Sequence, residues 1–165
     1  MTTSSLTSLR KLDGLLDGLG LLALRLWLGQ TFLMAGWLKL SDGAVAPDWF
    51  QMLDFPWPQR LLGAQANWVM AGTGETLLGL AITLGLGSRF AALGLLYITW
   101  VAVRTVHFDL GWAGWNQIET PDGQGFMVPL MLALMLLAVL TQGAGQWSID
   151  RWWQVRQQTQ TPPAP

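Results

Sequence analysis

The stretch LGLLALRLWLGQTFLMAGWL at residues 19–38 decides the fold of this chain. A helix of about 20 apolar residues is long enough to cross a hydrocarbon core about 30 Å thick. A cleaved signal peptide is the rival interpretation, because Arg10 and Lys11 precede the stretch. However, the run is longer than a signal core, and no small-residue cleavage pattern follows it. The stretch is therefore predicted to be a retained membrane-spanning helix.

The composition of the chain agrees with a membrane protein. Of 165 residues, 52% are hydrophobic and 12% are charged, about half the charged share of a soluble domain. The net charge of −1 provides no basic surface for phosphates, which excludes nucleic acid as a partner. The chain has no cysteine, which excludes disulfide and thiolate chemistry by this chain alone. The lipid bilayer is the expected surrounding.

Further apolar stretches predict an all-α fold, an integral membrane four-helix bundle. The expected spans are 19–38, 67–86, 90–106 and 126–140. They lie in a domain at 18–153, between an N-terminal cytoplasmic segment at 1–17 and a disordered cytoplasmic tail at 154–165. Loops with excess Lys and Arg stay cytoplasmic. The segments assigned to that side carry Arg10, Lys11, Arg89, Arg151 and Arg156, so both termini are predicted to be cytoplasmic.

Three charged side chains lie inside these stretches: Arg25, Glu75 and Arg104. A charge in the bilayer core costs at least roughly 2.5–3.5 kcal/mol, so such residues usually face other helices and pair. The helical rise places Arg25 about 10 Å from the cytoplasmic edge, Glu75 about 18 Å and Arg104 about 21 Å. Glu75 and Arg104 are therefore the predicted pair, with one positive charge left over. Two interpretations stay open: a structural clasp, or a site for an anion or a polar head group.

Residues three and four positions apart share one face of a helix. In the first span, this face carries Arg25, Gly29, Phe32, Gly36 and Lys39. In the second span it carries Gly72, Glu75, Gly79 and Ile82, and in the third Tyr97, Trp100, Arg104 and His107. All three faces are predicted to point into the bundle. The candidate ligand pocket next to the charged site consists of Lys39, Tyr97, Trp100 and His107.

Two loops on the predicted outer side combine aromatic and acidic residues. The first contains DWFQMLDFPWPQR (48–60) and the second is HFDLGWAGWNQIETPDGQG (107–125). Amphipathic Trp rings favour the boundary between membrane and water. Together the loops are predicted to form a lid over the mouth of the bundle. The expected partner-docking residues are Trp49, Trp57, Trp112 and Trp115.

Two groups of residues resemble metal ligands. Thioethers can bind Cu(I), but methionine in a packed or lipid-facing helix is ordinarily packing material. In the fourth span, three methionines recur every four residues and form a stripe on one face: Met127, Met131 and Met135. A second group, His107, Asp109, Glu119 and Asp122, offers nitrogen and oxygen ligands in a spacing that matches no known metal site. No metal site is therefore assigned.

Four segments resemble the DoxX family of membrane proteins in their order and spacing. They are LRLWLGQTFLMAGWLKL (24–40), GETLLGLAITLGLGSRFAAL (74–93), RTVHFDLGW (104–112) and GAGQWSIDR (143–151). The outer loop with its WP element and the VHFDLGW segment resemble the HvfX-like branch. The resemblance implies a multi-pass four-helix bundle in the bacterial inner membrane. The family's motif residues map onto Arg25, Gly29, Gly36, Lys39, Glu75, Gly79, Arg89 and Ser148–Asp150.

The resemblance also implies a redox-linked function. Some members are treated as the membrane subunit of a thiosulfate:quinone oxidoreductase, and others are linked to oxidative-stress complexes or to peptide and copper-handling gene clusters. We expect an accessory or anchoring subunit of a redox-linked complex, with quinone as the candidate cofactor and catalysis, if any, shared with partner subunits. The alternative is a structural subunit that docks membrane or periplasmic proteins through its Trp-rich loops. Small-solute transport, copper handling and homo-oligomer formation are kept as lesser alternatives.

Overall fold

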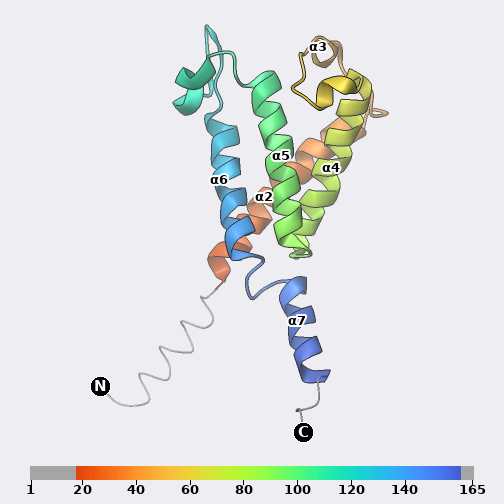
Figure 1. The fold of residues 1–165 in the computed structure, drawn as a ribbon, viewed down its shortest axis with the longest axis vertical. Coiled ribbons are helices and arrows are strands. Elements are labelled where there is room, and N and C mark those ends of the chain that lie inside the picture. The colour runs from red at the N-terminus through yellow and green to blue at the C-terminus, as the bar shows by residue number, and fades with distance from the viewer. Residues whose placement is uncertain (1–17, 161–165) are drawn as a thin grey trace, which may run out of the picture.

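The computed structural model describes residues 18–160, which are mostly helical (Figure 1). Helices cover the four stretches predicted as spans, with ends that differ by a few residues. They are α2 (Leu19–Leu40), α4 (Ala64–Leu84), α5 (Ser88–Val106) and α6 (Met127–Gln142), and we call them the helical body. The predicted N-terminal segment, 1–17, lies outside the described residues, as do residues 161–165.

The remaining elements lie at the two ends of the helical body (Figure 1). The loop end carries α3 (Asp48–Gln51), η1 (Gln59–Leu61), η2 (Gly111–Asn116) and an antiparallel pair of two-residue strands, β1 (Glu119–Thr120) and β2 (Gly123–Gln124). The C-terminal end carries the tight α4–α5 turn and helix α7 (Ile149–Gln160). The prediction of a disordered tail from residue 154 is thus wrong as far as Gln160. The Arg and Gln residues of this segment have good helix propensity, and the prolines come only after it.

Helices α2 and α4 form the most extensive contact between two elements, because glycines let their backbones approach closely. The buried residues of α2 include Gly29 and Gly36, and those of α4 include Gly72 and Gly79. A Cβ added at Gly36 would meet Thr76 Oγ1 and would lie 2.7 Å from Gly72 O. The faces predicted for these two helices therefore do point into the helical body.

A continuous apolar core joins all four helices. Its fully buried members are contributed by α2, α4, α5 and α6, so no helix packs on one neighbour alone. These residues are Leu28, Phe32, Ile82, Ala91, Ala92, Leu95, Leu136 and Val139. A second, smaller cluster at the loop end contains Ala46, Phe50 and Phe55, which pack against Trp68 of α4.

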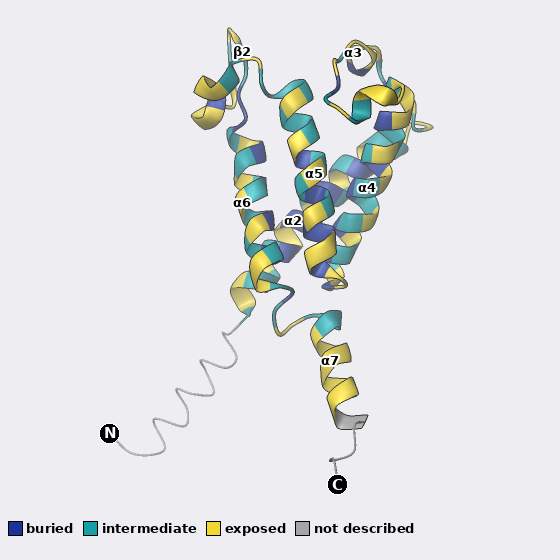
Figure 2. Cartoon of the chain, viewed as in Figure 1, coloured by how far each residue is buried: buried dark blue, intermediate teal, exposed yellow. Residues whose placement is uncertain are grey.

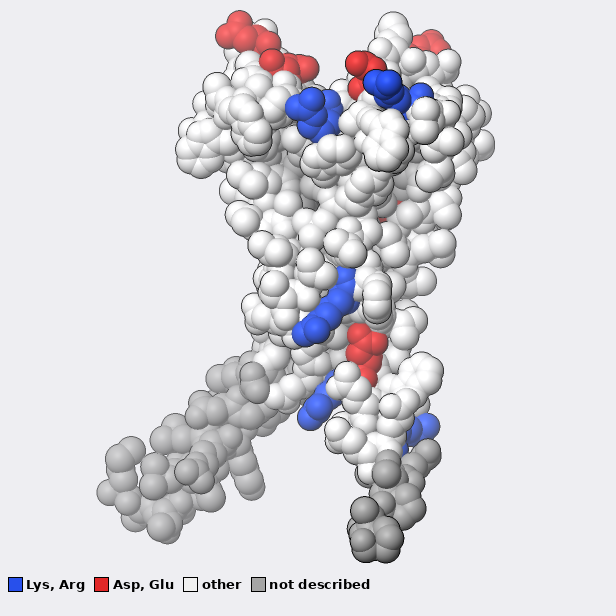
Figure 3. All heavy atoms as spheres, viewed as in Figure 1, with Lys and Arg blue, Asp and Glu red and all other residues white. Residues whose placement is uncertain are grey.

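The outside of the helical body is also apolar, as in a membrane protein. Helices α2 and α5 are long and apolar enough to cross a bilayer, and α6 is apolar but shorter. Large side chains such as Trp37 and Phe90 are 66% and 84% exposed, and Figure 2 shows such exposed positions along the outward faces of the helices. On the face drawn in Figure 3, charged atoms lie mainly toward the two ends. An extended apolar surface of this kind indicates contact with lipid or protein.

Candidate functional site

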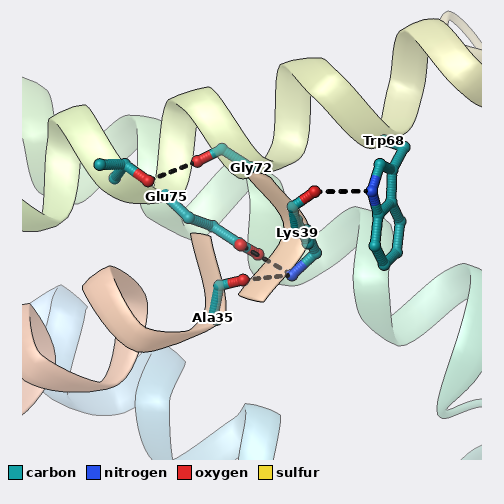
Figure 4. A network of polar contacts seen from close by, with 6 residues as sticks. Ala35, Lys39, Trp68, Gly72 and Glu75 are labelled. Carbon is teal, nitrogen blue, oxygen red and sulfur yellow. Dashed lines mark hydrogen bonds and ion pairs between the residues drawn. The ribbon is translucent and has the colours of Figure 1, made fainter. Parts of the chain in front are cut away.

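An ion pair joins the end of α2 to the middle of α4. Nζ of Lys39 lies 2.7 Å from Oε2 of Glu75 and donates a second, longer hydrogen bond to the carbonyl of Ala35 (Figure 4). The two side chains are 20% and 10% exposed. Water screens such a pair little, so its attraction is stronger than that of a surface pair, although desolvation of both charges offsets much of the gain.

Trp68 holds the lysine from the loop side. Its indole Nε1 donates to the carbonyl of Lys39 at 3.0 Å, and that carbonyl belongs to the last turn of α2, where helical acceptors lack partners (Figure 4). Nζ of Lys39 also lies 5.7 Å from the centroid of the Trp68 ring, within the range of a cation–π contact. Lys39 is therefore fixed between a carboxylate and an aromatic face.

A cavity of about 450 Å³ opens next to this pair, between α4 and α5. Its walls are mostly apolar, and Met70 and Tyr97, which are 57% and 42% exposed, carry it to the protein surface. The polar side chains that line it are Lys39, Gln59, Asn67, Glu75, Tyr97, Thr105 and His107. This volume, with few polar groups in an apolar wall, is typical of small-molecule sites, which span roughly 300–1,000 Å³.

The loop between α2 and α4 covers the loop end of this cavity. Phe50 and Phe55 line the cavity, and the Phe50 ring lies 4.8 Å from that of Trp68. The second loop supplies no lining residue after His107. The predicted lid of two loops is thus wrong, because the η2 and β1–β2 segment packs beside α6 instead (Figure 1).

His107 lies at the rim of the cavity, directly after the last residue of α5. Burial lowers the pKa of its imidazole below the ordinary value, and the nearby charge of Asp109 partly opposes this shift. The neutral ring, with one donor and one acceptor nitrogen, is therefore favoured at neutral pH.

Arg104 does not pair with Glu75. It is exposed, and its guanidinium carbon lies 4.7 Å from the ring centroid of Phe108. Position 104 is in the last turn of α5, from which a long side chain can reach the aqueous boundary. The buried face of α5 consists of Ser88, Ala91, Ala92, Leu95 and Thr99, so the predicted face with Tyr97, Trp100, Arg104 and His107 is wrong as an interior face.

Arg25 is buried at 1% exposure but is not part of the Glu75 site. Its guanidinium donates to the carbonyls of Ala144 and Trp147, and more weakly to that of Thr83. It therefore binds the link between α6 and α7 at the C-terminal end. Asp150 lies in the first turn of α7, directly after that link. Its carboxylate accepts hydrogen bonds from the backbone N–H groups of Gly87 and Ser88 at the start of α5.

The Trp residues proposed for docking differ in their surroundings. Trp49 lines the cavity and contacts Phe50 and Trp68, although half of its surface is exposed. Trp112 rests on Phe108 and Phe126 and is 81% exposed. Trp57 and Trp115 are also exposed, at 69% and 58%. Three of the four therefore present most of their ring to the surroundings.

Comparison with known proteins assigns the family. The DoxX family profile matches residues 20–108, which cover α2, the loop between α2 and α4, α4 and α5. The chain belongs to the DoxX family. An uncharacterized protein of Haemophilus influenzae is 32% identical over 142 residues, which cover 85% of this chain and 87% of that protein. No solved structure matches the chain.

In this DoxX protein, the sequence predicted a few of the residues that line the cavity but not its ion pair. Lys39, Glu75, Tyr97 and His107 line one cavity, whereas Trp100 stacks on Tyr97 outside it. The pairing of Lys39 with Glu75 was missed, although the predicted face of the first span ends with Lys39. Trp68 and Asn67 were not predicted as site residues. The aromatic residues of the loop between α2 and α4 were the available signal, since three of them line the cavity: Trp49, Phe50 and Phe55.

Proposed function

We propose that α2, α4, α5 and α6 of this DoxX-family membrane protein form a four-helix bundle in the bacterial inner membrane, with both termini cytoplasmic. The apolar outer faces of the helices and the loop charges support this arrangement. In this orientation, the cavity lies toward the periplasmic half of the bilayer.

The cavity is proposed to bind an amphipathic ligand with a polar head group, of which a quinone is the best candidate. The observation that carries this proposal is the Lys39–Glu75 pair in the wall of a mostly apolar 450 Å³ cavity. A purely structural clasp gains nothing from an adjoining open cavity. Tyr97 and Met70 extend the cavity to the lipid-facing surface, so a lipid-soluble molecule can enter from the bilayer.

The chemistry of the lining suits such a head group. The Lys39 ammonium offers donors to a carbonyl oxygen, while Glu75 accepts from a hydroxyl. At the rim, the neutral imidazole of His107 can donate or accept a hydrogen bond. A bound quinone would supply the redox chemistry, and the residues of this chain would orient it and exclude water.

Under this proposal, the protein is an accessory or anchoring subunit, and a partner exchanges electrons with the bound molecule. The chain has no cysteine, so a dithiol cannot be the electron carrier here. The redox partner would reach the cavity at the loop end, where Phe50 and Phe55 form its cover.

Purification in mild detergent followed by solvent extraction tests the proposal. The wild-type protein should release quinone in a fixed ratio, and Glu75→Gln should lower that ratio severalfold because the head group loses a charged partner. Glu119→Gln is the matched control, since this carboxylate is exposed and outside the cavity. Equal quinone content in wild type and Glu75→Gln, or none in either, would refute the assignment.

The exposed Trp residues of the loops favour a second candidate, a docking subunit without ligand chemistry. Trp57 and Trp112 are 69% and 81% exposed, and aromatic side chains of this kind are enriched in binding hot spots. Affinity purification should recover a stoichiometric partner that Trp57→Ala or Trp112→Ala removes. Retention of the partner by both variants would exclude this role for the loops.

A further inference from the structure

A second hollow, of about 600 Å³, lies at the C-terminal end of the helical body. It is lined by the first residues of α5 on one side and by the link between α6 and α7 on the other. Its lining is far more polar than that of the first cavity and includes Ser88, Arg89, Ser148, Asp150 and Arg151. Nothing in the proposed quinone site uses these residues.

One buried hydroxyl at this hollow lacks a hydrogen-bond partner among the described residues. Ser88 is 1% exposed, and its Oγ has no hydrogen-bond partner within residues 18–160. A buried hydroxyl without a partner is costly, so a ligand with acceptor oxygens would complete this site.

The charge at the hollow is mainly positive. Arg89 donates from Nη2 to the carbonyl of Thr141 at 3.2 Å, which holds its guanidinium against the end of α6. Arg151 lines the opposite side, and Arg25 lies behind the floor, bonded to the carbonyl of Ala144. The carboxylate at the hollow is that of Asp150, which is already bound by the N–H groups of Gly87 and Ser88.

We propose that this hollow binds a phosphate group, carried by the headgroup of a phospholipid in the adjoining leaflet. Guanidinium groups and a hydroxyl donor match phosphate oxygens in charge and hydrogen-bonding capacity. The lipid source is favoured because Phe90, which also lines the hollow, is 84% exposed and offers an apolar surface to an acyl chain. The site would fix the α4–α5 turn and α7 at the membrane surface.

Native mass spectrometry after reconstitution in equal parts of phosphatidylcholine and phosphatidylglycerol tests the proposal. The wild-type protein should retain one phospholipid, preferentially phosphatidylglycerol. Ser88→Ala and Arg151→Gln should each lower retention about tenfold, the effect expected for loss of one hydrogen bond to a charged group. Arg60→Gln, which removes an exposed guanidinium at the loop end, is the matched control and should retain the lipid.

A second experiment distinguishes a phospholipid from inorganic phosphate as the ligand. Thermal unfolding in detergent is compared in inorganic phosphate and in chloride at equal ionic strength. Stabilisation by phosphate that Ser88→Ala abolishes, without lipid retention, would support the phosphate site but overturn the lipid source. Absence of both lipid retention and phosphate stabilisation would overturn the proposal. Each variant's melting temperature in chloride reports whether the fold is intact.

Discussion

Lys39 reaches Glu75 from the adjacent helix with its Nζ 2.7 Å from Oε2, at a depth where Arg104 was the expected partner. The contact follows from the register of the antiparallel α2–α4 packing, in which a Cβ added at Gly72, one turn before Glu75, would lie 3.0 Å from Lys39 Cβ. The flexible lysine side chain covers the remaining distance.

The ion pair should show strong coupling in a double-mutant cycle. Glu75→Gln and Lys39→Met each leave one charge without its partner and should lower the free energy of unfolding by about 3 kcal/mol. The double variant Lys39→Met/Glu75→Gln should lose less than the sum of the two single variants, because no unpaired charge remains. Unfolding by SDS in mixed micelles measures these values. Additive effects would show that the two groups do not interact.

Because α2 packs closely on α4, alanine substitutions at different glycines of α2 should have unequal effects on stability. Gly36→Ala should destabilise the protein by about 1–3 kcal/mol, because the new Cβ would press on Thr76 and on the Gly72 carbonyl. Gly20→Ala is the matched control in the same helix, since no atom lies within 4 Å of its added Cβ. It should be neutral or slightly stabilising, as alanine favours helix. Equal melting temperatures for the two variants would contradict the helix packing described.

The sequence predicted the helices and two interior faces well. Charges and glycines at three- and four-residue steps on the first two spans marked the faces that are buried in α2 and α4. Helical periodicity and the avoidance of lipid by polar groups act on the same residues there, so both signals agree.

The third span shows why the interior face of α5 and the partner of Glu75 could not be predicted from the sequence. The rule that charges face the interior selected Arg104, but a residue in the last turn can reach water without an internal partner. The true interior face of α5 is made of small residues such as Ala91 and Ala92. Depths counted along separate helices also gave Glu75 the wrong partner, since the register between α2 and α4 is set by the close packing of their glycines and not by local sequence.

The contribution of Arg25 to stability should depend on the geometry of its guanidinium and not only on its charge. Arg25→Lys keeps the charge but cannot reach the carbonyls of Ala144 and Trp147 together, so we expect a loss of about 2 kcal/mol or more. Hydrogen exchange across residues 143–150 should accelerate. Arg60→Lys, at an exposed loop position, should change stability by less than about 0.5 kcal/mol. Unchanged exchange in Arg25→Lys would contradict this role.

His107 should make stability depend on pH. Burial lowers the pKa of the folded-state imidazole below 6.5, so the unfolded chain binds more protons in the interval between the two pKa values. The free energy of unfolding should therefore fall as the pH drops through 6.5 and level off below the folded-state pKa. The chain has one His, so His107→Gln should remove this dependence. A slope that persists in His107→Gln would assign the effect to another group.

The most direct test of the central claim is the titration of the purified protein with a short-chain quinone, followed by quenching of Trp fluorescence. Trp49 and Trp68 line the cavity, so binding there should quench emission to saturation. Ala102→Phe fills the cavity while leaving the Lys39–Glu75 pair in place, and Leu134→Phe is its control on an exposed face of α6. The account predicts saturable quenching in wild type and Leu134→Phe, with affinity at least about tenfold lower in Ala102→Phe. Identical titration curves for all three proteins would contradict it.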